Sequence, residues 1–127
     1  SNYLQNPSTE IEVPECYLES ASITSGSRTS IIVTVKNNDE DSHLIRIEFK
    51  SHELVSFSQE SRVLPIKDGT WYYEYTIPSS TIQSEEIYVM PELESGISEI
   101  TYRISVAVFS DGIQTYDINL DLSVKAS

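Results

Sequence analysis

The amino-acid sequence predicts an all-β protein, a β-sandwich of two antiparallel sheets. Several stretches alternate apolar and polar residues with a period of two, and residues 116–125 do so without a break. This alternation is typical of a strand with one face in a core and the other in water. No segment of comparable length has helical spacing. Turn-forming residues interrupt the chain about every 8–12 residues, as expected for the short strands of a sandwich.

The first part of the chain predicts a lead-in and an edge strand. Residues 1–10 are polar and show no apolar pattern, so we expect them to be flexible ahead of a single domain that spans residues 11–127. Two apolar stretches, residues 11–13 and 16–18, flank Pro14. Because proline cannot donate a hydrogen bond to a neighbouring strand, these stretches predict an edge strand that is split in two.

The next strands lie between residues 30 and 57. Residues 30–35 alternate, but Ile32 adds an apolar side chain to the second face, which indicates a central strand that is covered on both sides. Residues 37–42 consist of turn-forming and charged residues. Residues 44–50 alternate again, and residues 55–57 indicate a short further strand. The predicted apolar face of residues 44–50 consists of Ile45, Ile47 and Phe49.

A hairpin is predicted over residues 62–77. The dipeptide Asp68-Gly69 is a strong signal for a two-residue turn, because glycine accepts the positive φ that a type I′ turn requires. Pro65 places the incoming arm at the edge of a sheet. The outgoing arm, residues 71–77, is dense in the aromatic residues that favour strands.

The remaining strands complete an immunoglobulin-like pattern. Residues 87–90 form a short strand that Pro91 ends, and residues 92–98 form a crossing loop. Residues 100–108 place five apolar side chains on one face, and a turn at residues 110–112 leads into the final strand. About seven to nine short strands separated by regular turns predict an immunoglobulin-like β-sandwich.

Composition limits the classes of partner. The chain has 127 residues and 39% hydrophobic content, which suits one domain with its own core. Its net charge is −12 and its eight basic residues are scattered, so we expect neither nucleic-acid nor anionic-lipid binding. No apolar run approaches the roughly 20 residues of a membrane span. Ser1-Asn2 is typical of a tag-cleavage scar, so membrane contact is expected only through an anchor upstream of this sequence.

Cys16 is the single cysteine, so no disulfide can form within the chain. Its position in an apolar stretch predicts a buried thiol that packs as a small hydrophobic group. The alternative is an intermolecular disulfide or a reactive nucleophile.

Three segments resemble a known family. Residues 31–38 (IIVTVKNN) are similar to a strand of the CARDB-like modules, the cell-adhesion-related domains of prokaryotic surface proteins. Residues 90–96 (MPELESG) and 102–106 (YRISV) are similar to the loop and penultimate strand of that family, and in outline to fibronectin type III domains. The resemblance implies an immunoglobulin-like module on a cell envelope, used for adhesion, spacing or assembly. These families carry no catalytic residues to transfer.

An acidic loop offers candidate metal ligands. In an immunoglobulin-like topology, the loop after the second strand lies at the same end as the loop before the last strand. Asp39 and Asp41 would then approach Asp111, and Asn37 and Asn38 could add oxygen ligands to a calcium site. The alternative is an ordinary polar turn in water. No other metal or cofactor is predicted.

The aromatic strand offers a second candidate site. Trp71, Tyr73 and Tyr75 share one face, while Tyr72 lies on the other beside Glu74. A row of rings is typical of carbohydrate-binding sandwiches. Large aromatic side chains, however, usually belong to the core, and a tyrosine-rich edge also suits a protein interface.

The sequence does not predict an enzyme. His43 and His52 are expected at the surface near strand ends, without a third ligand at zinc spacing. There is no Gly-x-Ser-x-Gly motif and no glycine-rich phosphate loop. We therefore expect an extracytoplasmic interaction, adhesion or assembly domain that acts through edge strands and loops. The expected partner is another cell-envelope protein or a second copy in a homodimer, and the alternative function is carbohydrate binding.

Overall fold

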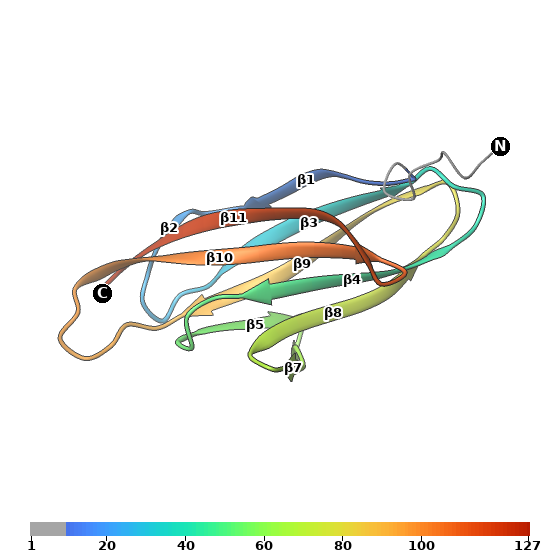
Figure 1. Ribbon diagram of the computed structural model, residues 1–127. Helices are drawn as coiled ribbons and strands as arrows, with labels where there is room; N and C mark the ends of the chain where they lie inside the picture. Colours follow the sequence, from blue (N-terminus) through green and yellow to red (C-terminus); the bar gives the residue numbers. More distant parts are fainter. Residues whose placement is uncertain (1–9) are drawn as a thin grey trace.

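The computed structural model describes residues 10–127, and these form eleven strands in two sheets with no helix (Figure 1). The predicted all-β sandwich is confirmed. The strand count exceeds the predicted seven to nine because three strands are only two or three residues long. The flexible lead-in expected for residues 1–10 lies, apart from Glu10, outside the described residues. None of the described residues belongs to a helix long and apolar enough to cross a membrane.

The two sheets pack face to face and are nearly all antiparallel; the exception is the pairing of β2 with β11, which is parallel. The five-stranded sheet has the order β1 (Ile11–Leu18), β3 (Thr29–Asn37), β9 (Thr81–Pro91), β5 (Val55–Gln59) and β6 (Arg62–Val63). The six-stranded sheet has the order β2 (Ser22–Thr24), β11 (Ile113–Lys125), β10 (Glu99–Ser110), β4 (His43–Lys50), β8 (Thr70–Ile77) and β7 (Ile66–Lys67).

β1 lies at a sheet edge, as predicted, but it is not split in two. The strand continues through Pro14, and its register against β3 shifts between Glu12 and Glu15. A bulge of this kind accommodates a residue that cannot donate to the ladder. The chain then crosses to the other sheet, where β2 pairs with the end of β11.

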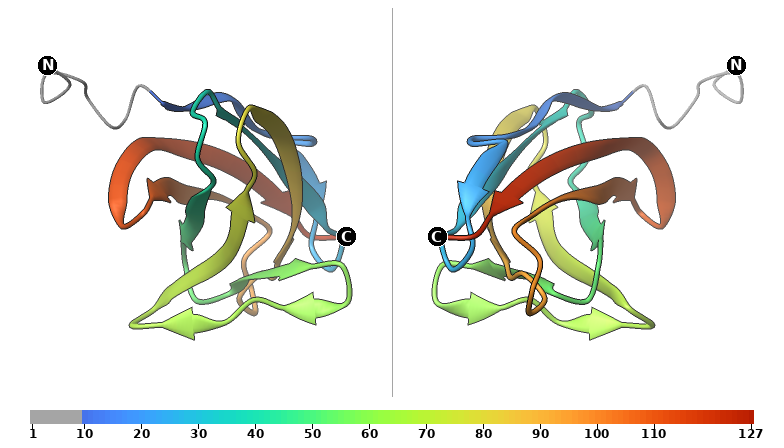
Figure 2. Two further views of the ribbon diagram at one scale, coloured as in Figure 1. Left: turned by 90° about the vertical axis from the view of Figure 1, so that its right-hand side faces the viewer. Right: turned by 90° about the vertical axis from the view of Figure 1, so that its left-hand side faces the viewer.

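The hairpin predicted over residues 62–77 is correct at its turn and in its outgoing arm, which is β8, but not in its incoming arm. β7 and β8 pair across Asp68-Gly69, whose φ angles are 53° and 77°, as a type I′ turn requires. The incoming arm is divided, because β6 pairs with β5 in the other sheet and only β7 pairs with β8. Between them the buried side chain of Leu64 anchors the crossing, which joins the two layers along one side (Figure 2).

β9 is longer than the predicted strand of residues 87–90. It begins at Thr81 and pairs with β3 up to Val89. No apolar alternation marks the added stretch, because several of its residues are polar. Their polar groups are satisfied across the ladder instead, for example by the 2.7 Å hydrogen bond between the hydroxyls of Thr34 and Ser84.

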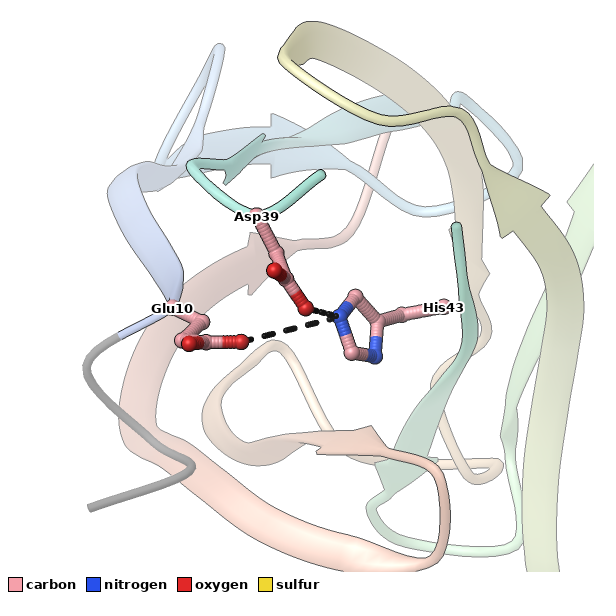
Figure 3. Close-up of side chains that lie close together, drawn as sticks. All are labelled: Glu10, Asp39 and His43. Atoms are coloured by element: carbon pink, nitrogen blue, oxygen red, sulfur yellow. Dashed lines mark hydrogen bonds and ion pairs between the residues drawn. The ribbon is translucent and has the colours of Figure 1, made fainter. Parts of the chain in front are cut away.

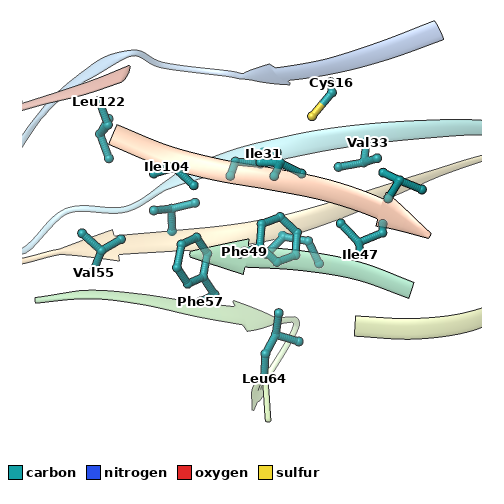
Figure 4. Packing of buried hydrophobic residues seen from close by; sticks show 14 of the residues in the cluster. Cys16, Ile31, Val33, Ile47, Phe49, Val55, Phe57, Leu64, Ile104 and Leu122 are labelled. Atoms are coloured by element: carbon teal, nitrogen blue, oxygen red, sulfur yellow. The ribbon is translucent and has the colours of Figure 1, made fainter. Parts of the chain in front are cut away.

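The core lies between the predicted apolar faces. Ile45, Ile47 and Phe49 of β4 are fully buried. The Phe49 ring stacks on Phe57 of the opposite sheet, with 5.2 Å between the ring centroids (Figure 4). Cys16 is buried in the same cluster, and burial raises the pKa of its thiol to about 11. The prediction of a thiol that packs as a hydrophobic group is confirmed.

A tyrosine ties the crossing loop to the six-stranded sheet. Tyr102, near the start of β10, is buried, and its hydroxyl donates a 2.6 Å hydrogen bond to the carbonyl oxygen of Glu92. A tyrosine that bonds back to the backbone of the preceding loop is a feature of immunoglobulin-like sandwiches.

Candidate functional site

One end of the sandwich gathers charged side chains around His43, the first residue of β4 (Figure 3). The imidazole Nε2 lies 2.7 Å from Oδ2 of Asp39 and 4.0 Å from Oε2 of Glu10. Nδ1 lies 2.5 Å from Oδ2 of Asp111. His43 lies at a strand end, as expected, but its side chain is only 17% exposed and both ring nitrogens contact carboxylates. We call Glu10, Asp39, His43 and Asp111 the His43 cluster.

Asn37 shapes the loop that carries Asp39. It is the last residue of β3 and is 1% exposed. Its side-chain oxygen accepts a hydrogen bond from the Asp39 backbone N–H at 2.9 Å, and its amide donates to the carbonyls of Asp41 and Pro78 at 2.9 and 3.0 Å. A buried amide with all these partners fixes the loop, and the loop in turn aims the Asp39 carboxylate at His43.

Asp111 lies in the turn between β10 and β11 and connects that turn to β4. Its backbone has a φ of 50°, in the left-handed region that aspartate tolerates in tight turns. Oδ1 accepts the Leu44 N–H at 3.0 Å, and the Asp111 N–H donates to the Leu44 carbonyl at 2.9 Å. The structure therefore brings together the two loops that the topology argument placed at the same end.

Hydrogen bonding favours the charged forms of His43 and its two aspartates. The bond to Asp111 raises the pKa of His43 above 6.5, and the same bond holds the pKa of Asp111 below 3.8. A hydrogen bond between the carboxyl groups of Glu10 and Asp39 raises the pKa of Glu10 and lowers that of Asp39. Both ring nitrogens of His43 thus lie against carboxylates, an arrangement that favours the protonated ring.

The predicted calcium ligands are brought together only in part. Asp39 and Asp111 meet at His43, whereas Asp41 contributes its backbone carbonyl to Asn37. One ligand atom each from Glu10, Asp39 and His43 lies within 4.8 Å of the others. A nitrogen with two carboxylates suits zinc better than calcium, which prefers oxygen ligands alone.

Sequence reasoning missed Glu10 and His43 as members of this cluster. Glu10 fell within the expected lead-in, and no local motif marks it. The four-residue spacing of Asp39 and His43 within one loop was the available signal.

The aromatic strand faces the interior on one side. Trp71, Tyr73 and Tyr75 pair with the buried side of β4 and pack against the core. The Trp71 ring contacts Phe57 with 5.6 Å between the ring centroids. Burial raises the pKa of Tyr73 to about 12 and also raises that of Tyr75, whose buried hydroxyl has no hydrogen-bond partner.

Tyr72 lies on the outer face of β8, where a cation covers its ring. The guanidinium carbon of Arg46 is 3.9 Å from the ring centroid, and Arg46 also forms ion pairs with Glu48 and Glu74 at 2.9 and 3.2 Å. The four predicted aromatic residues therefore do not form one exposed row of rings, and the carbohydrate alternative gains no support from their placement.

β8 and β9 face each other across one side of the sandwich. The Tyr73 hydroxyl donates to Oε1 of Glu85 at 2.8 Å and thereby links the two sheets. Beside this link lies a pocket of about 210 Å³, lined by Gln59, Arg62, Val63, Leu64, Pro65, Tyr72, Tyr73 and Glu74. We call this pocket together with residues 73–77 of β8 and 81–87 of β9 the open side.

The geometry offers no paired nucleophile and base. Among residues 10–127, the ring of His43 bonds to carboxylates, and that of His52 accepts the Leu54 N–H at 3.0 Å and lies 3.7 Å from Glu94. No hydrogen bond in this part of the chain joins a serine hydroxyl or the Cys16 thiol to a histidine.

Comparisons with known proteins identify the fold and no family. No family model and no curated protein sequence matches the chain. The cohesin module of a family 33 glycoside hydrolase from Clostridium perfringens is similar, with a TM-score of 0.56 and 12% identity over 91% of this chain and 98% of that one. A cohesin in a type I cohesin–dockerin complex from Clostridium thermocellum has a TM-score of 0.54 and 9% identity over 92% and 94%.

The fold also occurs as part of larger proteins. The alkylpurine DNA glycosylase AlkC from Pseudomonas fluorescens is similar, with a TM-score of 0.57 and 10% identity. The match covers 92% of this chain but only 31% of the glycosylase. At such identities the likeness establishes an immunoglobulin-like β-sandwich and does not single out the CARDB-like modules.

Proposed function

We propose that this domain is a non-catalytic module that binds another protein, as part of an extracytoplasmic or cell-surface assembly. The observation that carries the proposal is the open side. There, two strand edges that have no partner strand within residues 10–127 occur together with a pocket and exposed apolar side chains. Cohesin modules, one of them in a complex with a dockerin, have the same fold and support a role in protein binding.

The open side has the composition of a protein interface. Ile82 on β9 is 62% exposed and Val63 at the pocket is 71% exposed. Tyr72 and Tyr73 line the same pocket, together with Arg62. Tyrosine and arginine are enriched among the residues that dominate binding energy, and apolar groups next to a pocket allow a partner side chain to be buried.

Charge distinguishes between the two expected kinds of partner. A net charge of −12 disfavours nucleic acids and anionic lipids. It also disfavours a homodimer through the open side, because Glu85 and Glu86 of one copy would approach those of another. We therefore propose a different protein as the partner.

Position-specific photo-crosslinking in cells of the source organism tests this proposal. A photoreactive amino acid replaces Ile82 on the open side, and in a matched control it replaces Ile113, which is also an exposed isoleucine (52%) but lies next to the turn at the end with the His43 cluster. We expect one protein to be crosslinked in the envelope fraction at position 82 and not at position 113, and to bind the purified domain. The same experiment is repeated with the photoreactive amino acid in place of Val63 at the pocket. If neither position 82 nor position 63 gives a crosslinked protein, the proposal is contradicted.

A further inference from the structure

We propose that the outer edge of β9, over residues 82–86, binds an extended, positively charged segment of the partner as an additional strand. The inference rests on the proposed function and specifies how the open side would act. It follows from the directions of the backbone groups, from the lack of protection at this edge, and from its charge.

β9 has a strand on both sides over only part of its length. It pairs with β3 from Thr81 to Val89 without a shift in register. On its other edge it pairs with β5 only from Tyr88 to Pro91. Within residues 10–127, no strand pairs with that edge over residues 81–87.

The alternation of an antiparallel ladder shows which backbone groups face outward. The Leu64 N–H donates to the Phe57 carbonyl, so the backbone groups of Phe57 point toward β6 and away from β9. The neighbouring pair, Ser58 with Tyr88, must then be the hydrogen-bonded one. The N–H and C=O of Tyr88 therefore point toward β5, that is, to the edge of β9 opposite β3, which we call its outer edge.

Residues two apart in a strand direct their backbone groups to the same edge. The N–H and C=O groups of Ile82, Ser84 and Glu86 therefore point outward with those of Tyr88. These six groups have no partner strand in the described part of the chain. They form a template to which three residues of a second strand can hydrogen-bond.

Apart from residues 73–77 of β8, which belong to the same open side, the other edges of the sandwich are short, interrupted or lie beside another strand. Proline and a bulge interrupt β1, and β2, β6 and β7 are only two or three residues long. β1 runs beside β11, the other long edge strand (Figure 1). Residues 81–87 contain no proline, no lysine and no bulge. Their charged residues, Glu85 and Glu86, oppose the addition of an acidic strand but not of a basic one.

Two fixed carboxylates define the chemistry of the partner. On the outer face, Glu86 accepts a 2.8 Å hydrogen bond from the Ser30 hydroxyl; on the inner face, Glu85 accepts one from Tyr73. A strand added here would place its side chains opposite Ile82 and Glu86. It would suit an apolar residue at the first position and a lysine or arginine at the second.

A short synthetic peptide that alternates lysine with valine or threonine tests the inference by NMR titration of the isotope-labelled domain. We expect the amide signals of Ile82, Ser84 and Glu86, which exchange fast with solvent in the unbound domain, to shift and become protected. Shifts confined to residues 117–121 of β11, or no binding at millimolar peptide, would overturn the proposal. So would retained binding by a peptide N-methylated at the residues facing β9, or by one with glutamate in place of lysine.

A pair of variants at one position isolates the backbone. Ser84→Pro removes an outward N–H without removing a backbone hydrogen bond to β3. Both Ser84→Pro and Ser84→Ala remove the hydroxyl bond to Thr34, so a difference between the two variants reports on the backbone. Thermal unfolding verifies that both variants fold. We expect Ser84→Pro to weaken peptide binding at least about tenfold and Ser84→Ala to leave it within about twofold.

The same pair separates this inference from the function on which it rests. If a protein crosslinked at position 82 binds Ser84→Pro as tightly as the wild type, strand addition is wrong and the interaction module stands. If no protein is crosslinked on the open side although the peptide binds and protects the β9 amides, the edge is competent and the proposed function is wrong.

Discussion

At the scale of single residues, His43 shows how one side chain at a strand end connects two loops, because it bonds to a carboxylate from each. Both imidazole nitrogens face aspartate carboxylates, one from the loop before β4 and the other from the turn between β10 and β11. Asp111 also binds the backbone of Leu44. Removing the imidazole would leave both carboxylates without their shared cation.

The His43 cluster predicts that stability falls with rising pH. A raised histidine pKa contributes stability that is complete below the ordinary value of 6.5 and is lost as the pH rises through the higher, folded-state value. Allowing for solvent screening, we expect a loss of about 0.5–1 kcal/mol, or a few degrees in Tm, as the pH rises from below 6.5 through the raised pKa of His43. His43→Gln should flatten this dependence in thermal unfolding.

A parallel loss at low pH comes from Asp111, whose lowered pKa contributes stability that is lost as the pH falls below 3.8. Glu10→Gln is a useful comparison, because it removes a carboxylate 4.0 Å from the ring but leaves both aspartates bonded to His43, so most of the dependence on histidine should remain. Identical pH profiles for the wild type and His43→Gln would contradict an imidazolium link.

Tyr102 offers a second test at this scale. Tyr102→Phe keeps the buried ring and removes the hydrogen bond to the Glu92 carbonyl. We expect the free energy of unfolding in urea to fall by about 0.5–1.5 kcal/mol. Tyr17→Phe, at an exposed position, should change it by less than about 0.5 kcal/mol, and equal effects of the two variants would contradict the role of the hydrogen bond.

At the scale of elements, the turns were predicted well because their signals are local. Asp68-Gly69 and Asp111-Gly112 both have the positive φ angles of two-residue hairpin turns. The incoming arm of the β7–β8 hairpin was predicted less well than its turn. The segment before Asp68 contains two very short strands that belong to different sheets, and a two-residue strand leaves no periodic pattern.

Gly69 is the position at which the β7–β8 turn is most sensitive. Gly69→Ala forces a φ of 77° on a residue with a Cβ, although the space around the site is open. We expect the free energy of unfolding to fall by about 1–2 kcal/mol, measured by urea denaturation. Asp68→Asn is the matched control, because asparagine also tolerates a positive φ, and it should have little effect. An unchanged free energy of unfolding in the Gly69→Ala variant would contradict the type I′ geometry.

At the scale of the whole molecule, the two sheets are held together by one apolar layer. Phe49 and Phe57 come from opposite sheets, and Trp71 extends the same contact toward the open side. The alternation of apolar and polar residues predicts the buried face of β4 correctly, and that of β10 from Tyr102 onward, whereas Ile100 at the start of β10 is exposed. The sandwich therefore follows from patterning, while its strand order does not.

The contact between the sheets predicts a large effect for one substitution. Phe57→Ala should lower the free energy of unfolding by about 3–5 kcal/mol, through lost burial and a cavity between the layers. Ile82→Ala, on the exposed open side, should change it by less than about 0.5 kcal/mol. Similar effects of the two substitutions in urea denaturation would contradict this assignment of the core.

The candidate sites could be predicted only in part. The sequence showed that Asp39 and Asp111 would lie at one end and that Trp71, Tyr73 and Tyr75 would share a face. It could not show that His43 would lie between the aspartates, because that contact joins residues 68 positions apart. Nor could it show the unpaired edge of β9, because polar residues such as Ser84 and Glu86 hide the strand itself.

Local patterns in the sequence were sufficient to predict the class of the fold, most of the buried faces and the places where the chain turns. Each of these depends on neighbours within a few residues, through period-two alternation and the φ preferences of glycine and aspartate. The folded structure was needed to show which strands pair, where the chain changes sheets, what surrounds His43 and which edge remains open. Those outcomes depend on contacts between distant residues, which a local pattern does not encode.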